Sequence, residues 1–165
     1  MAQRGLERTV QQSVLDRLID TEPDSVIEPP RTHSQSVREL KRAVRRDIEW
    51  LLNTRRTIIP VPADLAEVTR SVFVYGLPDI SSLSSESGDA RERLRRQVED
   101  AIALFEPRLT GVSVAFVPDE GSGRRELRFV IDAVLQMDPT PEQVSFDTVF
   151  EVTSSKFQVG GQADA

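Results

Sequence analysis

Apolar residues recur along the chain first at helical spacing and then, beyond Pro107, at alternating positions. A repeat of three to four residues predicts an amphipathic helix, whereas a repeat of two predicts a strand with one buried face. The helical repeat covers residues 10–20, 36–52 and 89–105. We expect Ser34 or Ser36 to cap the second of these helices. The buried stripes of the two longer helices are Val37, Leu40, Val44, Ile48 and Leu51, then Leu94, Val98, Ala101, Ile102 and Phe105.

The start of the third helix and the chain before it have their own signals. Asp89 with Glu92 has the spacing of a capping box, so we expect the helix to begin there. Ahead of it, the turn "YGLPD" combines a glycine with a proline, and two further prolines lie close together at Pro60 and Pro62. Glycine permits a positive φ and proline ends a helix, so this connection is predicted to be ordered, irregular and partly made of short helical turns.

Alternation of apolar and polar residues follows in three stretches, at 112–116, 127–137 and 144–152. The segments "PDEGSGR" and "DPTPEQ" separate these three stretches and are typical of turns. The expected fold is α+β, with N-terminal helices followed by an antiparallel β-meander of three or four strands and the helices packed on one face. We expect the stretch at 144–152 to be the edge strand of the sheet.

The predicted helices and strands suggest three parts. Residues 1–33 comprise the first amphipathic helix and a proline-rich linker, residues 34–157 form the main domain, and residues 158–165 form a flexible tail. Long proline-rich connections are uncommon inside compact domains. Two alternatives therefore stay open for the first helix, which either packs on its own domain or docks on a partner.

Composition narrows the class of protein. The chain has 165 residues and 38% hydrophobic residues, which suits one domain, and it has no cysteine. Its N-terminus has charges throughout and no apolar signal region, so we expect a cytoplasmic protein that does not insert into a membrane. The net charge of −6 includes a basic strip, because residues 31–56 hold eight basic and three acidic side chains. An acidic protein with such a strip is unsuited to nucleic acid and suits docking onto other proteins.

Candidate chemistry is sparse. His33 is the only histidine, which argues against a metal site or a serine-type triad, and the glycines of "DEGSGRRE" lack a Walker lysine. Glu106 is the candidate for carboxylate chemistry. A glycosidase, however, needs two carboxyl groups roughly 5–10 Å apart, and no second acid is placed obviously by the sequence. Arg108 also favours the charged form of Glu106, which opposes a general-acid role. The other interpretation is that Glu106 and Arg108 form a structural clasp between helix and strand.

Three motifs carry a family resemblance: "LLNTRR" (51–56), "YGLPD" (75–79) and "FEPRL" (105–109), with "SVLDRL" (13–18) ahead of them. In this order and spacing they resemble the TssE proteins of type VI secretion, which belong to the lysozyme-like family of contractile tail baseplates. The resemblance covers most of residues 13–152.

The resemblance implies a structural protein of a contractile injection system. It implies a place in the cytoplasmic baseplate next to the inner membrane, contacts with TssF, TssG and TssK, and a role in starting the TssB/TssC sheath. The exposed edge expected of the meander adds the hypothesis that sheath strands extend it by strand addition. No catalytic residue, metal or cofactor is expected, and the alternative is a peptidoglycan-cleaving muramidase that uses Glu106. The residues expected to serve assembly are Glu106, Pro107, Arg108, Tyr75, Gly76, Leu77, Pro78, Asp79, Asn53, Arg55, Arg56, Arg42, Arg45 and Arg46.

Overall fold

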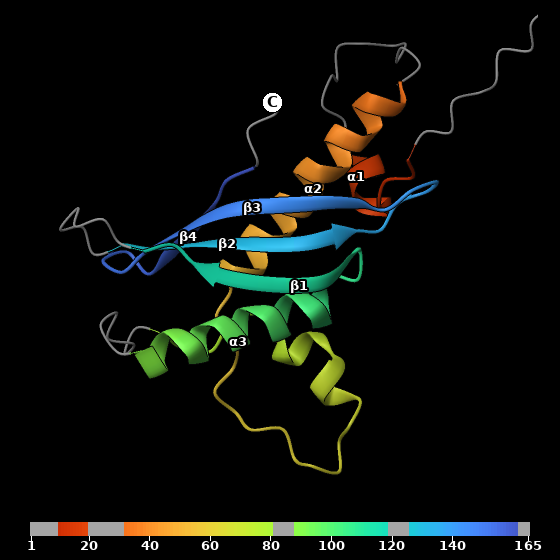
Figure 1. The fold of residues 1–165 in the computed structure, drawn as a ribbon. Helices are drawn as coiled ribbons and strands as arrows, with labels where there is room; N and C mark the ends of the chain where they lie inside the picture. Colours follow the sequence, from red (N-terminus) through yellow and green to blue (C-terminus); the bar gives the residue numbers. More distant parts are fainter. Residues whose placement is uncertain (1–9, 20–31, 81–87, 119–125, 162–165) are drawn as a thin grey trace, which may run out of the picture. The chain divides into compact units, whose positions relative to one another are not determined.

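The computed structural model of the chain describes residues 10–19, 32–80, 88–118 and 126–161. Helices precede a four-stranded antiparallel sheet (Figure 1), so the predicted α+β fold is confirmed. Most of the predicted linker and the loop after the first strand lie outside the described residues.

The chain divides into two compact units, Met1–Val44 and Arg45–Ala165. None of the described helices combines the length and the apolar character that a bilayer crossing requires. The helical elements are α1 (Val14–Leu18), α2 (His33–Asn53), the 3₁₀ turns η1 (Val68–Arg70) and η2 (Val72–Val74), and α3 (Gly88–Phe105).

The predicted stripes of the two long helices are buried except for Val37 and Phe105, which are half-buried, but the capping residues differ from the prediction. The cap of α2 is Thr32, whose hydroxyl accepts the N–H of Gln35 while the Gln35 side chain accepts the N–H of Thr32. This reciprocal capping box leaves Ser36 free to act elsewhere, so the prediction of Ser34 or Ser36 as the cap is wrong.

The predicted capping box of α3 is also wrong. The helix already begins at Gly88, so Asp89 lies inside its first turn. The carboxylate of Glu92 accepts hydrogen bonds from the guanidinium groups of Arg95 and Arg96, one turn further along. These i,i+3 and i,i+4 pairs lie on the helix surface, where such contacts each contribute only a few tenths of a kcal/mol.

The sheet has the order β1-β2-β3-β4, and each strand is antiparallel to the next. Every second residue of β2 and β3 is buried, as the alternation of apolar residues predicts. A β-bulge interrupts β1 between Thr110 and Ser113, where Gly111 has a φ of 62°. The strands are β1 (Leu109–Phe116), β2 (Glu126–Leu135), β3 (Glu142–Glu151) and β4 (Lys156–Val159).

The fourth strand changes the predicted edge and tail. β4 folds back along β3 and pairs Lys156 with Glu151 and Val159 with Thr148. The second half of β3 is therefore not an edge, in contrast to the prediction for 144–152. Gln158 and Val159, which the sequence suggests to be tail, belong to β4, while residues 162–165 lie outside the described part.

Side chains of two helices cover the outer edges of the sheet. On β1, the backbone N–H of Val114 donates to the Glu99 carboxylate of α3 at 2.9 Å. On β4, the side-chain amide of Asn53 donates to the carbonyl of Phe157 and accepts its N–H, both at 2.9 Å. Covered edges offer no free row of backbone groups to another chain. The two outermost strands are thus closed at these positions.

A short contact between two of the sequence motifs joins the two ends of residues 55–77, which follow α2. Arg55 and Leu77 form an isolated parallel bridge, in which Arg56 N–H donates to Leu77 C=O and Leu77 N–H donates to Thr54 C=O. Gly76 has a φ of 98°, and a Cβ added to it would lie 2.3 Å from the Thr54 carbonyl oxygen. Only glycine fits such a close approach of two backbones.

We therefore expect Gly76→Ala to lower the free energy of unfolding by at least about 2 kcal/mol, because the new methyl group would separate the bridge and strain the backbone. Gly88→Ala is the matched control, since a Cβ there meets nothing within 4 Å. Its stability should stay within about 0.5 kcal/mol of the parent, measured by urea unfolding. Equal losses in both variants would contradict this account of Gly76.

Candidate functional site

The motif Glu106-Pro107-Arg108 forms the turn that joins α3 to β1. The N–H of Glu106 makes the last α-helical bond to Ile102, and the N–H of Leu109 donates to the carbonyl of Glu106 at 3.0 Å. Pro107 therefore occupies the second position of a four-residue turn, where its fixed φ is favourable and its missing N–H is not needed. The turn brings the side chains on either side of the proline together.

Arg108 holds the carboxylate of Glu106 with two arms of its guanidinium group. The Nε and Nη2 atoms donate to the two carboxylate oxygens at 2.6 and 2.5 Å, which is a bidentate ion pair. Glu106 is only 4% exposed and lies at the C-terminal end of α3, where the helix dipole disfavours a negative charge. The guanidinium compensates both the burial and the dipole, so this pair allows an acid to lie there.

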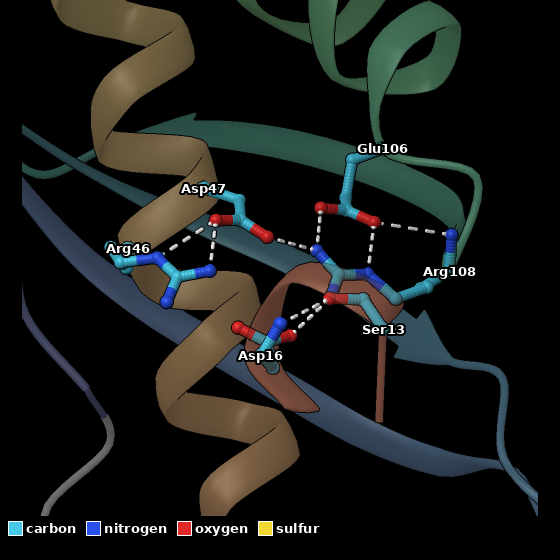
Figure 2. A network of polar contacts seen from close by, with 6 residues as sticks. All are labelled: Ser13, Asp16, Arg46, Asp47, Glu106 and Arg108. Atoms are coloured by element: carbon cyan, nitrogen blue, oxygen red, sulfur yellow. Dashed lines mark hydrogen bonds and ion pairs between the residues drawn. The ribbon is translucent and has the colours of Figure 1, made fainter. Parts of the chain in front are cut away.

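A second carboxylate binds the same guanidinium. The Nη2 atom of Arg108 also donates to Oδ2 of Asp47 at 2.5 Å, from α2 (Figure 2). Arg46 donates from Nε and Nη2 to the other oxygen of Asp47, and its guanidinium lies 4.8 Å from the centre of the Trp50 ring. We call Glu106, Arg108, Asp47 and Arg46 the four-charge cluster, which contains two negative and two positive side chains.

The cluster influences its surroundings in two ways. It raises the pKa of the Arg108 guanidinium, mainly through the hydrogen bonds that this group donates to Glu106 and then those to Asp47. It also contributes to a raised pKa of Tyr75, whose principal cause is burial, followed by the negative charges of Asp47 and Glu106. Tyr75 packs edge-on against Phe105 at 5.1 Å, so "YGLPD" and "FEPRL" meet beside the cluster.

Asp47 is the member of the cluster that sequence reasoning missed. It comes three residues after Val44 and four before Leu51, two buried residues of the α2 stripe. A carboxylate at that spacing lies on or beside the buried face of a helix, where it needs a partner. The spacing of Asp47 from the buried residues was therefore a signal that it needs a partner. That partner, Arg108, is 61 residues away in the sequence, and only the fold brings the two together.

The geometry does not suit a glycosidase, although two carboxyl groups are present. Such an enzyme places its acid and its second carboxylate on either side of the sugar bond, with room for substrate between them. Here the guanidinium of Arg108 occupies the space between Glu106 and Asp47 and binds both. A general acid must also reach the leaving oxygen of the substrate, whereas both carboxylate oxygens of Glu106 are bound by Arg108. The arrangement is that of a clasp.

The other residues expected to serve assembly have diverse positions. Leu77 is 2% exposed and Gly76 is buried, so both support the fold instead of offering a surface. Asn53 binds β4, as described above. Pro78 is half-buried. The exposed residues of this set are Arg42, Arg45, Asn53, Arg55, Arg56, Asp79 and Pro107.

We predict that Arg108→Ala lowers the free energy of unfolding by about 3 kcal/mol, because the buried Glu106 carboxylate would lose its counter-charge. Urea unfolding followed by circular dichroism measures the change. Arg96→Ala, which removes an arginine that is 68% exposed from the surface of α3, should change the stability by less than about 1 kcal/mol. If the two variants lost similar amounts of stability, the claim that Arg108 compensates the buried charge of Glu106 would be contradicted.

Comparison with known protein families gives one assignment. Residues 38–140 match the model of the family described as baseplate wedge protein gp25, whereas no curated protein matches the chain. The match spans more than half of the chain and contains the whole four-charge cluster and the bridge between Arg55 and Leu77. It confirms the resemblance to baseplate proteins that the sequence motifs suggest. The chain belongs to the baseplate wedge protein gp25 family.

Proposed function

We propose that this chain is the TssE-type wedge subunit of a type VI secretion baseplate, and that it helps to start assembly of the TssB/TssC sheath. In this proposal it works in the cytoplasm next to the inner membrane, together with TssF, TssG and TssK. Membership of the baseplate wedge family supports the structural role, and the order of the three sequence motifs supports the type VI assignment.

The observation that carries the sheath role is an open, unpaired stretch of β3, on the side where β4 lies. β4 pairs with β3 only from Thr148 to Glu151, so Glu142–Phe146 has no strand beside it on that side among the described residues. The carbonyl of Asp147 points to that side, because it accepts the N–H of Gly160 at 2.7 Å. Alternate residues of a strand direct their backbone groups to the same side, so those of Gln143 and Ser145 face the open position.

The open stretch fits an added strand from another protein. Such a strand would continue the line of β4 and pair with the backbone of Gln143 and Ser145, as in β-augmentation. Its inward side chains would extend the buried face that Val144 and Phe146 form. On the outer face, Asp132 and Asp147 are exposed and would favour a strand with basic residues.

Contacts with the other wedge subunits involve the basic strip on α2 in this proposal. Arg45 is exposed, and the exposed Trp50 is stacked by Arg46, which gives a combination common at the centres of protein interfaces. Arg108 keeps one buried nitrogen, Nη1, without a hydrogen-bond partner among the described residues. In this role the cluster assists assembly without cleaving a substrate.

The sheath role predicts a crosslink at Gln143. The chain has no cysteine, so Gln143→Cys introduces a unique thiol beside the open stretch. We expect it to form a disulfide with single-cysteine variants of the sheath subunit when purified TssB/TssC is allowed to assemble on the baseplate, with the product identified by mass spectrometry. Paired strands lie about 5 Å apart, so a cysteine at position 143 and one on the added strand are close enough to form a disulfide.

The matched control is Ser113→Cys, an exposed residue of β1 that is separated from β3 by the whole of β2. It should give no crosslink to the sheath subunit under the same conditions. Crosslinks at Ser113→Cys alone, or equal yields at both positions, would refute strand addition at β3.

A further inference from the structure

The short helix α1 exposes an apolar surface that the rest of its own unit does not cover. None of its five residues is buried. The side chains of Val14, Leu15, Leu18 and Ile19 are 73%, 53%, 77% and 45% exposed. These four residues share one helical repeat, and we call them the α1 apolar stripe. An amphipathic helix normally directs such a stripe into a core.

The segment that contains the α1 apolar stripe is fastened to α2. Val10, which is 9% exposed, donates its N–H to the hydroxyl of Ser36 at 3.1 Å, and Ser36 in turn donates to the carbonyl of His33. Gln12 donates from its side chain to the carboxylate of Glu39. These contacts lie within Met1–Val44, and they anchor the residues just before α1.

The helix itself is capped as well as anchored. Ser13 accepts the N–H of Asp16 at 3.1 Å and donates its hydroxyl to the carboxylate of the same residue (Figure 2). A helical turn of five residues is not stable by itself in water, because its nucleation is unfavourable. The anchor and the cap therefore hold the α1 apolar stripe in a fixed shape, which lowers the entropy lost when it binds.

The charges of α1 and of the sequence that follows it restrict what can cover the stripe. Asp16 lies within the helix, and the sequence continues with Asp20, Glu22 and Asp24, against the single basic residue Arg17. Two copies of so acidic a segment would repel each other if their stripes were joined. An anionic membrane would repel it too, since helices that lie on membranes carry lysine and arginine on their polar face. A protein groove with a basic rim is the complementary surface.

We propose that α1 docks its apolar stripe into a hydrophobic groove, rimmed by basic side chains, on another subunit of the baseplate wedge. This inference rests on the proposed function for the identity of the assembly. The family match begins at residue 38, so α1 lies outside the matched region and adds a contact of its own to it.

The test measures binding of the full chain to purified TssF–TssG complex by biolayer interferometry. The double variant Leu15→Ser/Leu18→Ser should bind about tenfold more weakly or worse, because burial of the two leucines is lost. Arg17→Ser is the matched control in the same helix. It truncates a long side chain to the same size, but it makes the segment more acidic, so binding should be unchanged or tighter.

Each alternative has a distinct result. Wild-type affinity in the double variant would overturn the docking of α1 while leaving the proposed function intact. Equal weakening in Arg17→Ser would also overturn it, because the loss would not be specific to the stripe. Absence of any binding by the parent chain would overturn the proposed function and this inference together.

Two further measurements address the other occupants. Sedimentation velocity should show the same mass for the parent chain and the double variant. A dimer that the leucine substitutions abolish would assign the stripe to a second copy and overturn the proposal. Co-sedimentation of the parent chain with vesicles of phosphatidylglycerol and phosphatidylcholine in equal parts would overturn it in favour of a membrane, and we expect no co-sedimentation.

Discussion

The guanidinium group of Arg108 holds the unit Arg45–Ala165 together, because it binds two carboxylates from distant parts of the chain. Glu106 closes α3 and Asp47 lies on α2, so one side chain ties the helix–strand turn to the other long helix. The turn also sets the start of β1, since the carbonyl of Arg108 accepts the N–H of Gln136 just after β2. A buried carboxylate at a helix C-terminus is unfavourable by itself, so the position of Glu106 makes Arg108 necessary.

Polar side chains are also bound internally at the sheet, where they hydrogen-bond to the backbone of the outer strands. Glu99 binds the edge of β1 at Val114 and Asn53 that of β4 at Phe157, and the beginning of β3 is where we propose that a strand is added. The carboxylates of Glu106 and Glu99 are thus bound within the protein, whereas the unpaired backbone of β3 and the apolar side chains of α1 are left for binding in the two proposals above. This division suits a protein that binds its neighbours, and the baseplate wedge family to which the chain belongs has that role.

Local patterns in the sequence were sufficient for the two long helices and the three long strands, but not for β4 or for the contacts between elements. The alternation of β2 and β3 and the stripes of α2 and α3 depend on neighbouring residues, so periodicity predicted them. β4 has only four residues, and Asn53, which holds its outer edge, is 104 residues away from Phe157. Asp47 is likewise remote from Arg108. The Thr32–Gln35 capping box was visible as a local motif, yet the two serines that follow fit a cap equally well.

The most direct test of the clasp is a double-mutant cycle between α2 and the turn. The free energies of unfolding of the parent chain, Asp47→Asn, Arg108→Met and the double variant are measured in urea. If Arg108 joins the two elements as described, the double variant loses less than the sum of the single variants, with a coupling of more than about 1 kcal/mol. Additivity within about 0.5 kcal/mol would show that Asp47 and Arg108 act independently and would contradict the clasp.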